Sequence, residues 1–312
     1  MSPSPSNSTS STLPRPVIES ISGLTSGVLT TLITHPLDLI KTRLQLASNP
    51  TSSRPVQFGA TWRVISEIRN TDGLSVRSLY RGISTNLAGN ASGWMLYFLI
   101  YGEVKEVAAG WRGRGGTVVG GSTGSGLTSY DYLWTSGFAG AVTQIITNPI
   151  WVLKTRMLST GANAVGAYKS TADGFRTLMR DEGVKGLYRG LIPSLWGVGH
   201  GALQFGIYEN LKIWRKDQKD GEDLATLDWL VTSAGAKVAA GSIMYPYQVV
   251  RARLQSYDAD KNYKNVRDVL RKVWRNEGFV GFYKGLTPNI VRVLPSTCIT
   301  FLVYEHMRKY LS

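Results

Sequence analysis

One proline-centred pattern occurs three times along the chain and constrains its fold more than any other feature. The copies are PLDLIKTRLQ from Pro36, PIWVLKTRML from Pro149 and PYQVVRARLQ from Pro246. Each is followed by an acidic-glycine and aromatic-basic-glycine segment: DGLSVRSLYRG (72–82), EGVKGLYRG (182–190) and EGFVGFYKG (277–285). Self-similarity at a fixed period is the sequence signature of a repeat architecture. We therefore expect three homologous units of roughly a hundred residues, stacked into one assembly.

The composition limits what this assembly can be. Lys and Arg number 35 against 21 Asp and Glu, a balance that suits nucleic acid, an anionic membrane surface or an anionic substrate. The single cysteine, Cys298, excludes a disulfide framework and a cysteine-rich zinc site, and the three histidines are too scattered for a metal motif. We find no nucleophile–base pairing and no dinucleotide fingerprint. The sequence therefore favours neither an enzyme nor a protein with a bound cofactor or metal.

Six segments have the length and composition of membrane-spanning helices. The expected ranges are 18–45, 131–158 and 227–255, which run into and through the prolines, and 84–108, 191–214 and 286–310, which follow the glycine segments. Almost no charge interrupts the stretch before each proline, and about 20 residues span a bilayer core. Polar residues are tolerated in such spans because helices around a water-filled cavity need only one apolar face.

Within each unit a polar segment with helical periodicity separates the two long helices. In 263–278 the apolar Val266, Val269 and Val273 share one face, as in a helix that lies on a membrane surface. We therefore expect an all-α membrane protein with six transmembrane helices in three pseudo-symmetric repeats around a central cavity, and three short amphipathic helices on one side. The expected boundaries are a disordered tail (1–16), repeats at 17–108, 130–215 and 227–312, a Gly/Ser-rich loop (109–129) and a linker (216–226).

The three prolines predict a gate at one end of the bundle. Proline bends a helix, so three bent helices would converge and bring the residues that follow each proline to the axis. Only Asp38 can form an ion pair there, with Lys154, because Trp151 and Gln248 stand where the other two repeats would carry carboxylates.

Softer contacts are expected to complete this first gate. Trp151 can hold Arg251 through a cation–π contact, and Gln248 can accept a hydrogen bond from Lys41. The first gate thus comprises Asp38, Lys41, Trp151, Lys154, Gln248 and Arg251.

A second ring of charges lies near the other end of the bundle. YENLK (208–212) and YEHMR (304–308) each place an acid three residues before a base, and YGEVK (101–105) departs from this pattern. We expect Glu209 to pair with Arg308 and Glu305 with Lys105, which leaves Lys212 without an obvious partner. The second gate thus comprises Lys105, Glu209, Lys212, Glu305 and Arg308. Two gates imply a central site that is exposed alternately to the two sides.

Two cations fall near mid-membrane between the gates. Arg292 lies 13 residues before Glu305, about 20 Å by helical rise, and Lys237 lies nine residues before Pro246, about 13 Å. An ionisable residue at that depth is costly and is by default a functional candidate. We therefore expect both cations to bind an anionic substrate.

Small and polar residues complete the expected substrate site. The positions equivalent to Arg292 are Gly89 and either Gly197 or Trp196, depending on which end of the helix sets the count. The small residues leave room for a broad planar ring, and nearby polar side chains could read its edges. The expected site comprises Gly89, Asn90, Gly197, His200, Gln204, Lys237 and Arg292.

Three copies of P-x-acid-x-x-basic-x-basic, each with an acid-Gly-aromatic-basic-Gly segment, closely resemble the mitochondrial carrier family over about residues 17–311. The resemblance implies six tilted transmembrane helices, three short matrix helices, a substrate site on the threefold axis and insertion in the inner mitochondrial membrane without a cleaved presequence. It places the first gate on the matrix side and the second on the cytoplasmic side. It also implies cardiolipin bound near Gly82, Gly190 and Gly285, and we expect the chain to act as a monomer.

Within this family the signatures indicate the kind of substrate. NPIWVLKTRM with Trp151 is similar to the branch that carries nucleotide-type cofactors, and Gln248 with GHGALQF (199–205) and WMLYF (94–98) is similar to FAD and folate carriers. We therefore expect a transporter of FAD, or of a related flavin or folate, that works by alternating access. The alternative within the class is an NAD or pyrimidine nucleotide carrier. A soluble nucleic-acid-binding repeat protein would leave the uncharged spans unexplained.

Overall fold

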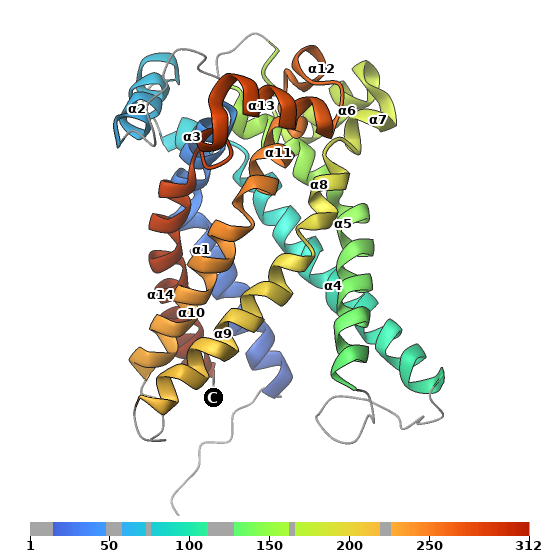
Figure 1. Ribbon diagram of the computed structural model, residues 1–312, viewed down its shortest axis with the longest axis vertical. Helices are drawn as coiled ribbons and strands as arrows, with labels where there is room; N and C mark the ends of the chain where they lie inside the picture. Colours follow the sequence, from blue (N-terminus) through green and yellow to red (C-terminus); the bar gives the residue numbers. More distant parts are fainter. Residues whose placement is uncertain are drawn as a thin grey trace, which may run out of the picture.

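The computed structural model describes residues 15–47, 58–72, 76–111, 128–161, 166–218 and 226–311, and every regular element in these ranges is a helix. Six long rods stand side by side, with the short helices gathered at one end (Figure 1). The all-α fold class is therefore confirmed. The rods are α1 (Arg15–Leu46), α4 (Ile83–Trp111), α5 (Ser129–Ser159), α8 with α9 (Leu191–Trp196, Gly199–Asp217), α10 with α11 (Thr226–Ile243, Tyr245–Gln255) and α14 (Leu286–Leu311).

Most of the expected tail, Gly/Ser-rich loop and linker lies outside the described residues, but the parts that are described extend the helices. α1 begins at Arg15, α4 continues to Trp111 and α9 to Asp217. Among the described helices, α14 alone is both long and apolar enough to pass a simple test for a membrane span. Polar residues dilute the other rods, as expected for helices that face a cavity.

The signature prolines act differently in the three repeats. α1 and α5 continue through Pro36 and Pro149. The fifth rod, in the third repeat, is interrupted at Met244, whose backbone leaves the helical range, and Pro246 then lies in the first turn of α11. Proline fits the first turn of a helix because the N–H that it lacks would have no partner there. Among the three signature prolines, only that of the third repeat therefore coincides with a break between two helices.

The short helices are α2 (Phe58–Asp72) with α3 (Val76–Leu79), α6 (Thr171–Asp181) with α7 (Gly183–Leu187), and α12 (Ala259–Asn262) with α13 (Val266–Gly281). α6 and α13 begin at capping side chains, and α13 packs through its apolar face. The side chains of Ser170 and Asn265 cap α6 and α13 by accepting from backbone N–H groups. The apolar face of α13 packs through Val269 and Val273 on Val250 and Leu254 of α11.

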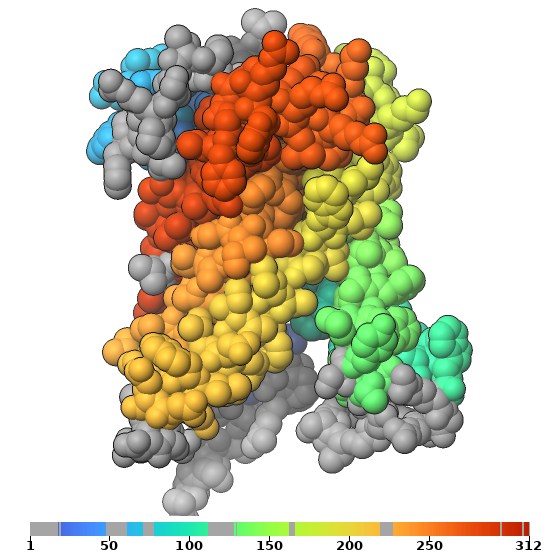
Figure 2. Space-filling view, in the orientation of Figure 1, coloured from blue at the N-terminus to red at the C-terminus, as the bar shows by residue number. Residues whose placement is uncertain are grey.

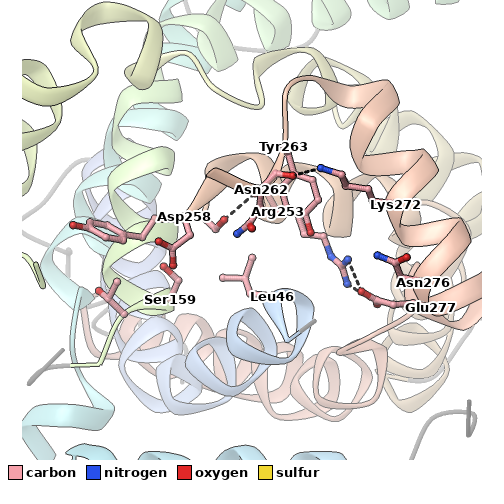
Figure 3. Close-up of a pocket in the computed structure, with 12 residues that line it drawn as sticks. Leu46, Ser159, Arg253, Asp258, Asn262, Tyr263, Lys272, Asn276 and Glu277 are labelled. Carbon is pink, nitrogen blue, oxygen red and sulfur yellow. Dashed lines mark hydrogen bonds and ion pairs between the residues drawn. The ribbon is translucent and has the colours of Figure 1, made fainter. Parts of the chain in front are cut away.

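Ion pairs join these short helices to the rods. Arg156 donates to both carboxylate oxygens of Glu182, with one distance of 2.8 Å, and Arg253 does the same to Glu277 at 2.7 Å for both contacts. The Arg253 pair lies beside a cavity of about 520 Å³ at the closed end of the bundle (Figure 3). In the second and third repeats the last basic residue of the proline signature thus meets the acid of the acidic-glycine segment, which explains why the two motifs recur together there.

Left-handed glycines close the ring of repeats. Gly82, Gly190 and Gly285 have φ of 74, 68 and 83°, values that favour glycine. Each lies against the next repeat in order: Gly82 faces Leu158, Gly190 faces Gln255, and Gly285 faces the Lys41 carbonyl. The rods also pair mainly between repeats, α1 with α14, α4 with α5 and α9 with α10. The bundle is therefore one closed threefold assembly.

Candidate substrate cavity and gate

A cavity of about 1250 Å³ lies between α4, α5, α8, α9 and α11. Figure 2 shows a hollow between α9 and α5, on the side of the bundle away from the short helices. Four of the expected substrate residues line the cavity: Gly89, Asn90, Gly197 and His200. Trp151 and Arg251 of the first gate also line it. The cavity therefore extends from the open side of the bundle to the gate.

The structure resolves which residue of the second repeat faces the cavity. The fourth rod is interrupted after Trp196, so that Gly197 and Val198 join α8 to α9. Gly197 lines the cavity, where a Cβ would come within 2.8 Å of the Tyr247 hydroxyl. Trp196 is 53% exposed and is not part of the cavity wall. Of the two candidate residues, Gly197 is thus the one that lines the cavity.

Three expected substrate residues, Gln204, Lys237 and Arg292, do not line this cavity. Lys237 is partly buried on α10, within electrostatic range of Arg292. Arg292 forms an ion pair with Asp38 of the first gate. The two expected mid-membrane cations therefore influence each other electrostatically, and one of them is already held by a carboxylate.

The first gate is held largely by uncharged partners. Lys41 donates to Gln248 Oε1 at 2.9 Å and to Asn289 Oδ1 at 2.8 Å. The Trp151 ring lies 5.6 Å from the Arg251 guanidinium carbon and 5.0 Å from Lys154 Nζ. Both soft contacts expected from the sequence are present. They tie α1, α5, α11 and α14 together at the closed end of the cavity.

The expected ion pair between Asp38 and Lys154 is not formed, and this expectation is corrected. Asp38 instead pairs with Arg292 and accepts a 3.5 Å hydrogen bond from Asn86. The reason is packing: α14 lies along α1 for much of its length, so the Arg292 side chain reaches Asp38 directly. Lys154 is meanwhile drawn to the indole of Trp151 on its own helix.

The charges at this gate do not balance. Lys41, Lys154, Arg251 and Arg292 face a single carboxylate, Asp38, which leaves a formal charge of +3 (four cations less one anion). Charges are screened less in a partly enclosed site than at an open surface. The closed end of the cavity is therefore suited to bind an anion.

The acids of the second gate pair within their own helices among the described residues. Glu209 pairs with Lys212 at 3.4 Å and Glu305 with Lys309 at 3.0 Å, each within one helix. Lys105 lies over the Tyr132 ring at 5.3 Å, so the expected pair of Lys105 with Glu305 is not formed. The side chain of Arg308 lies outside the described residues. Because the helices are separated at this end, their charges find partners within the helix or on aromatic rings instead.

Sequence reasoning missed several residues of the site. Asn289 precedes Arg292 by three positions on one helix face, so its place beside the gate could have been read from the helical period. Asn86 precedes Gly89 by three positions and Asn90 by four, so the helical period also places it on their side of α4. Nothing in the sequence pattern distinguishes Tyr247, which joins the cavity wall because α11 starts a new helix just before it.

A threefold helical bundle with a cavity open at one end and closed by a cationic gate at the other defines an alternating-access membrane transporter. The chain belongs to the mitochondrial carrier family: the family model described as mitochondrial carrier protein matches residues 14–110, 125–219 and 222–312. These three matches together contain every described helix of the bundle, except for the last residue of α4, Trp111.

Individual relatives are similar over nearly the whole chain. The Mitochondrial FAD carrier protein FLX1 of Saccharomyces cerevisiae is 41% identical over 300 residues, covering 93% of this chain and 96% of that protein. The Folate transporter 1, chloroplastic, of Arabidopsis thaliana is 36% identical and covers 93% and 94% of the two chains. The Nicotinamide adenine dinucleotide transporter 2, mitochondrial, of the same plant is 36% identical and covers 92% and 78%.

Proposed function

We propose that this protein transports FAD, or a related flavin or folate, across the inner mitochondrial membrane by alternating access. The observation that carries the proposal is a cavity of about 1250 Å³ that ends at a gate with an excess of three positive charges. FAD needs both the wide cavity and the cationic gate, because its ring system is broad and its diphosphate is anionic. Similarity to a yeast FAD carrier over nearly the full chain supports the same substrate.

In this proposal the substrate anion competes with a gate residue. Arg292 is paired with Asp38 and lies within electrostatic range of Lys237. A phosphate or carboxylate that binds these two cations draws Arg292 away from Asp38. Substrate binding thereby rearranges the matrix gate, and an interaction that is gained only as the gate opens lowers the barrier to opening. No covalent bond of the substrate changes.

The lipid and assembly state are part of the proposal. Gly82, Gly190 and Gly285 each precede the start of a rod, where free N–H groups favour an anion. We expect cardiolipin headgroups there, between the short helices and the rods. The bundle closes on itself without a partner, which supports a monomer as the transporting unit, and nucleic acid has no part in its function.

An NAD or pyrimidine nucleotide carrier is the second candidate. A plant NAD transporter is 36% identical to the chain, and NAD carries the same diphosphate as FAD. The cationic gate does not separate these ligands, so the ring at the other end of the molecule must do so.

Transport by purified protein tests the proposal. The protein is reconstituted in liposomes and the uptake of labelled FAD, folate, NAD and UTP is compared. We expect FAD uptake to exceed NAD and UTP uptake at equal concentration, and Arg292→Ala to abolish it while the helical circular dichroism is unchanged. Saturable NAD uptake without FAD uptake would establish the second candidate instead.

A further inference from the structure

Three residues that line the large cavity each carry a buried polar side-chain atom that has no hydrogen-bond partner among the described residues. The atoms are Thr143 Oγ1, Gln144 Nε2 and His200 Nδ1. The described residues contain five such buried atoms in all, so most of them belong to residues that line this one cavity. Buried polar groups are nearly always hydrogen-bonded, because an unsatisfied one costs free energy. Their convergence points to a ligand that completes them.

Thr143 departs from the behaviour of other threonines on α5. Thr135 and Thr147 donate to the carbonyls four residues earlier, at 2.7 and 2.8 Å. This is the usual way in which a helix satisfies a threonine hydroxyl. The Thr143 hydroxyl makes no such bond although it lies on the same helix. The hydroxyl is therefore left without a partner on a residue that lines the cavity.

The cavity wall beside these atoms is flat and bare. Four glycines line it where an added Cβ would meet nothing within 4 Å: Gly93, Gly137, Gly199 and Gly201. Trp94 and Tyr97 of α4 lie on the same wall, with ring centroids 6.3 Å apart. Aromatic side chains stack on planar rings, and a wall without side chains admits a ring that bulkier residues would block.

We propose that Thr143, Gln144 and His200 form a subsite that reads the polar edge of a planar heteroaromatic ring with carbonyl and ring-nitrogen groups. Gln144 Nε2 donates to a ring carbonyl, and the Thr143 hydroxyl and His200 Nδ1 pair with neighbouring edge atoms. Arg251, which lines the same cavity at the gate, joins Arg292 and Lys237 in binding the phosphate end. The subsite rests on the proposed function and adds to it the residues that select the ring.

Binding of riboflavin, which carries the ring without phosphate, tests the subsite apart from transport. Riboflavin fluorescence anisotropy is titrated with purified full-length protein, both wild type and the variants Thr143→Val and Gln144→Leu. We expect each variant to raise the riboflavin Kd about three- to tenfold, as for loss of one hydrogen bond. Thr135→Val is the matched control, because its hydroxyl bonds only within α5, and its Kd should equal that of wild type. Protection of wild type and variants against heat by inorganic pyrophosphate should be the same, since pyrophosphate has no ring.

The outcomes separate the subsite from the transport proposal. The subsite is overturned if Thr143→Val and Gln144→Leu bind riboflavin as tightly as Thr135→Val does. It is also overturned if the two variants lose pyrophosphate protection as much as they lose riboflavin affinity. If wild type takes up FAD in liposomes but binds no riboflavin, the subsite is wrong and the proposed function stands. If wild type binds riboflavin through these residues but takes up no FAD, the subsite stands and the proposed function fails.

Discussion

At the scale of single residues, Asp38 connects the proposed substrate cation to the matrix gate. It is the one carboxylate among the gate residues defined above, and its partner in the structure is Arg292. Arg292 is 31% exposed as a side chain, whereas Asp38 is 9% exposed. The guanidinium is therefore the more accessible partner of the pair. An anion that takes Arg292 must compete with Asp38 for the same charge.

A double-mutant cycle tests this pairing. Asp38→Asn and Arg292→Gln should each lower FAD uptake more than tenfold, because each leaves an uncompensated partner in a partly buried site. The double variant should lose no more than either single one, with a coupling of about 1 to 3 kcal/mol. The matched cycle uses Asp38→Asn with Lys154→Gln, where the losses should add. Additive losses in the first cycle and coupling in the second would restore the pair that the sequence suggested.

At the scale of elements, the left-handed glycines set how tightly the repeats approach. Gly285 has φ of 83°, and a Cβ there would lie 3.0 Å from the Lys41 carbonyl oxygen, a backbone atom that cannot rotate away. Gly183 has φ of 64°, but a Cβ there would meet nothing within 4 Å. The two positions share the same backbone strain and differ only in contact with a neighbouring repeat.

Alanine at these two positions separates strain from contact. Gly183→Ala should cost about 1 to 2 kcal/mol, the usual penalty for a left-handed residue with a side chain. Gly285→Ala should cost more, because α14 must also move away from α1. The melting temperatures of the two purified variants in detergent measure the difference. Equal melting temperatures would show that contact with the neighbouring repeat adds no cost at Gly285 beyond the backbone strain.

The ion pair between α11 and α13 makes stability depend on pH. Burial alone would raise the pKa of the Glu277 carboxyl, but hydrogen bonds and charges from Arg253 and Lys284 outweigh it and hold the pKa below its ordinary value of 4.5. A group whose pKa is lowered on folding contributes stability above its unfolded pKa and loses it as pH falls through the folded value. The contribution of Glu277 is therefore complete above about pH 4.5 and declines below it.

Melting temperatures across pH test this contribution. Glu277→Gln should melt well below wild type at pH 7, because it leaves the buried Arg253 with an incomplete partner. The difference should shrink as the pH falls below 4.5, where wild type loses the same charge. Asp181→Asn is the control: its pair with Arg180 is exposed on both sides and should matter little at any pH. A gap between Glu277→Gln and wild type that stays constant down to pH 3 would contradict the assignment.

These elements also show what the sequence can predict. The rods and short helices follow from hydrophobic length, helical period and the glycines and prolines that bound them. The partners of Lys41 and Arg251 follow from a threefold symmetry that brings equivalent positions together. The partner of Asp38 does not, because Arg292 reaches it from α14, outside the signature, through packing that no periodicity encodes. The orphan hydroxyl of Thr143 is likewise visible only once the cavity has formed around it.

At the scale of the whole molecule, the two gates have different strengths. The matrix gate is closed by hydrogen bonds to Lys41, cation–π contacts to Trp151 and one ion pair. Repulsion among the cations opposes closure. The gate therefore stays closed only because the hydrogen bonds, cation–π contacts and ion pair outweigh this repulsion. A carrier must break this gate once in every cycle. The free energy of these contacts therefore sets both the stability of the present state and the rate of leaving it.

Trp151→Glu tests whether gate strength limits turnover. The new carboxylate would lie near Arg251 and Lys154, which now contact the Trp151 ring at 5.6 and 5.0 Å, and would reduce the positive excess from three to two. If the closed gate gains about 1.4 kcal/mol, its opening slows about tenfold. We expect a higher melting temperature and a lower maximal FAD uptake rate than in Trp151→Gln, which removes the same ring without adding charge. Because both variants lose the aromatic wall of the cavity, any difference between them reports the gate alone. If the two transport FAD at the same rate and melt at the same temperature, residue 151 is not part of the barrier that the carrier crosses.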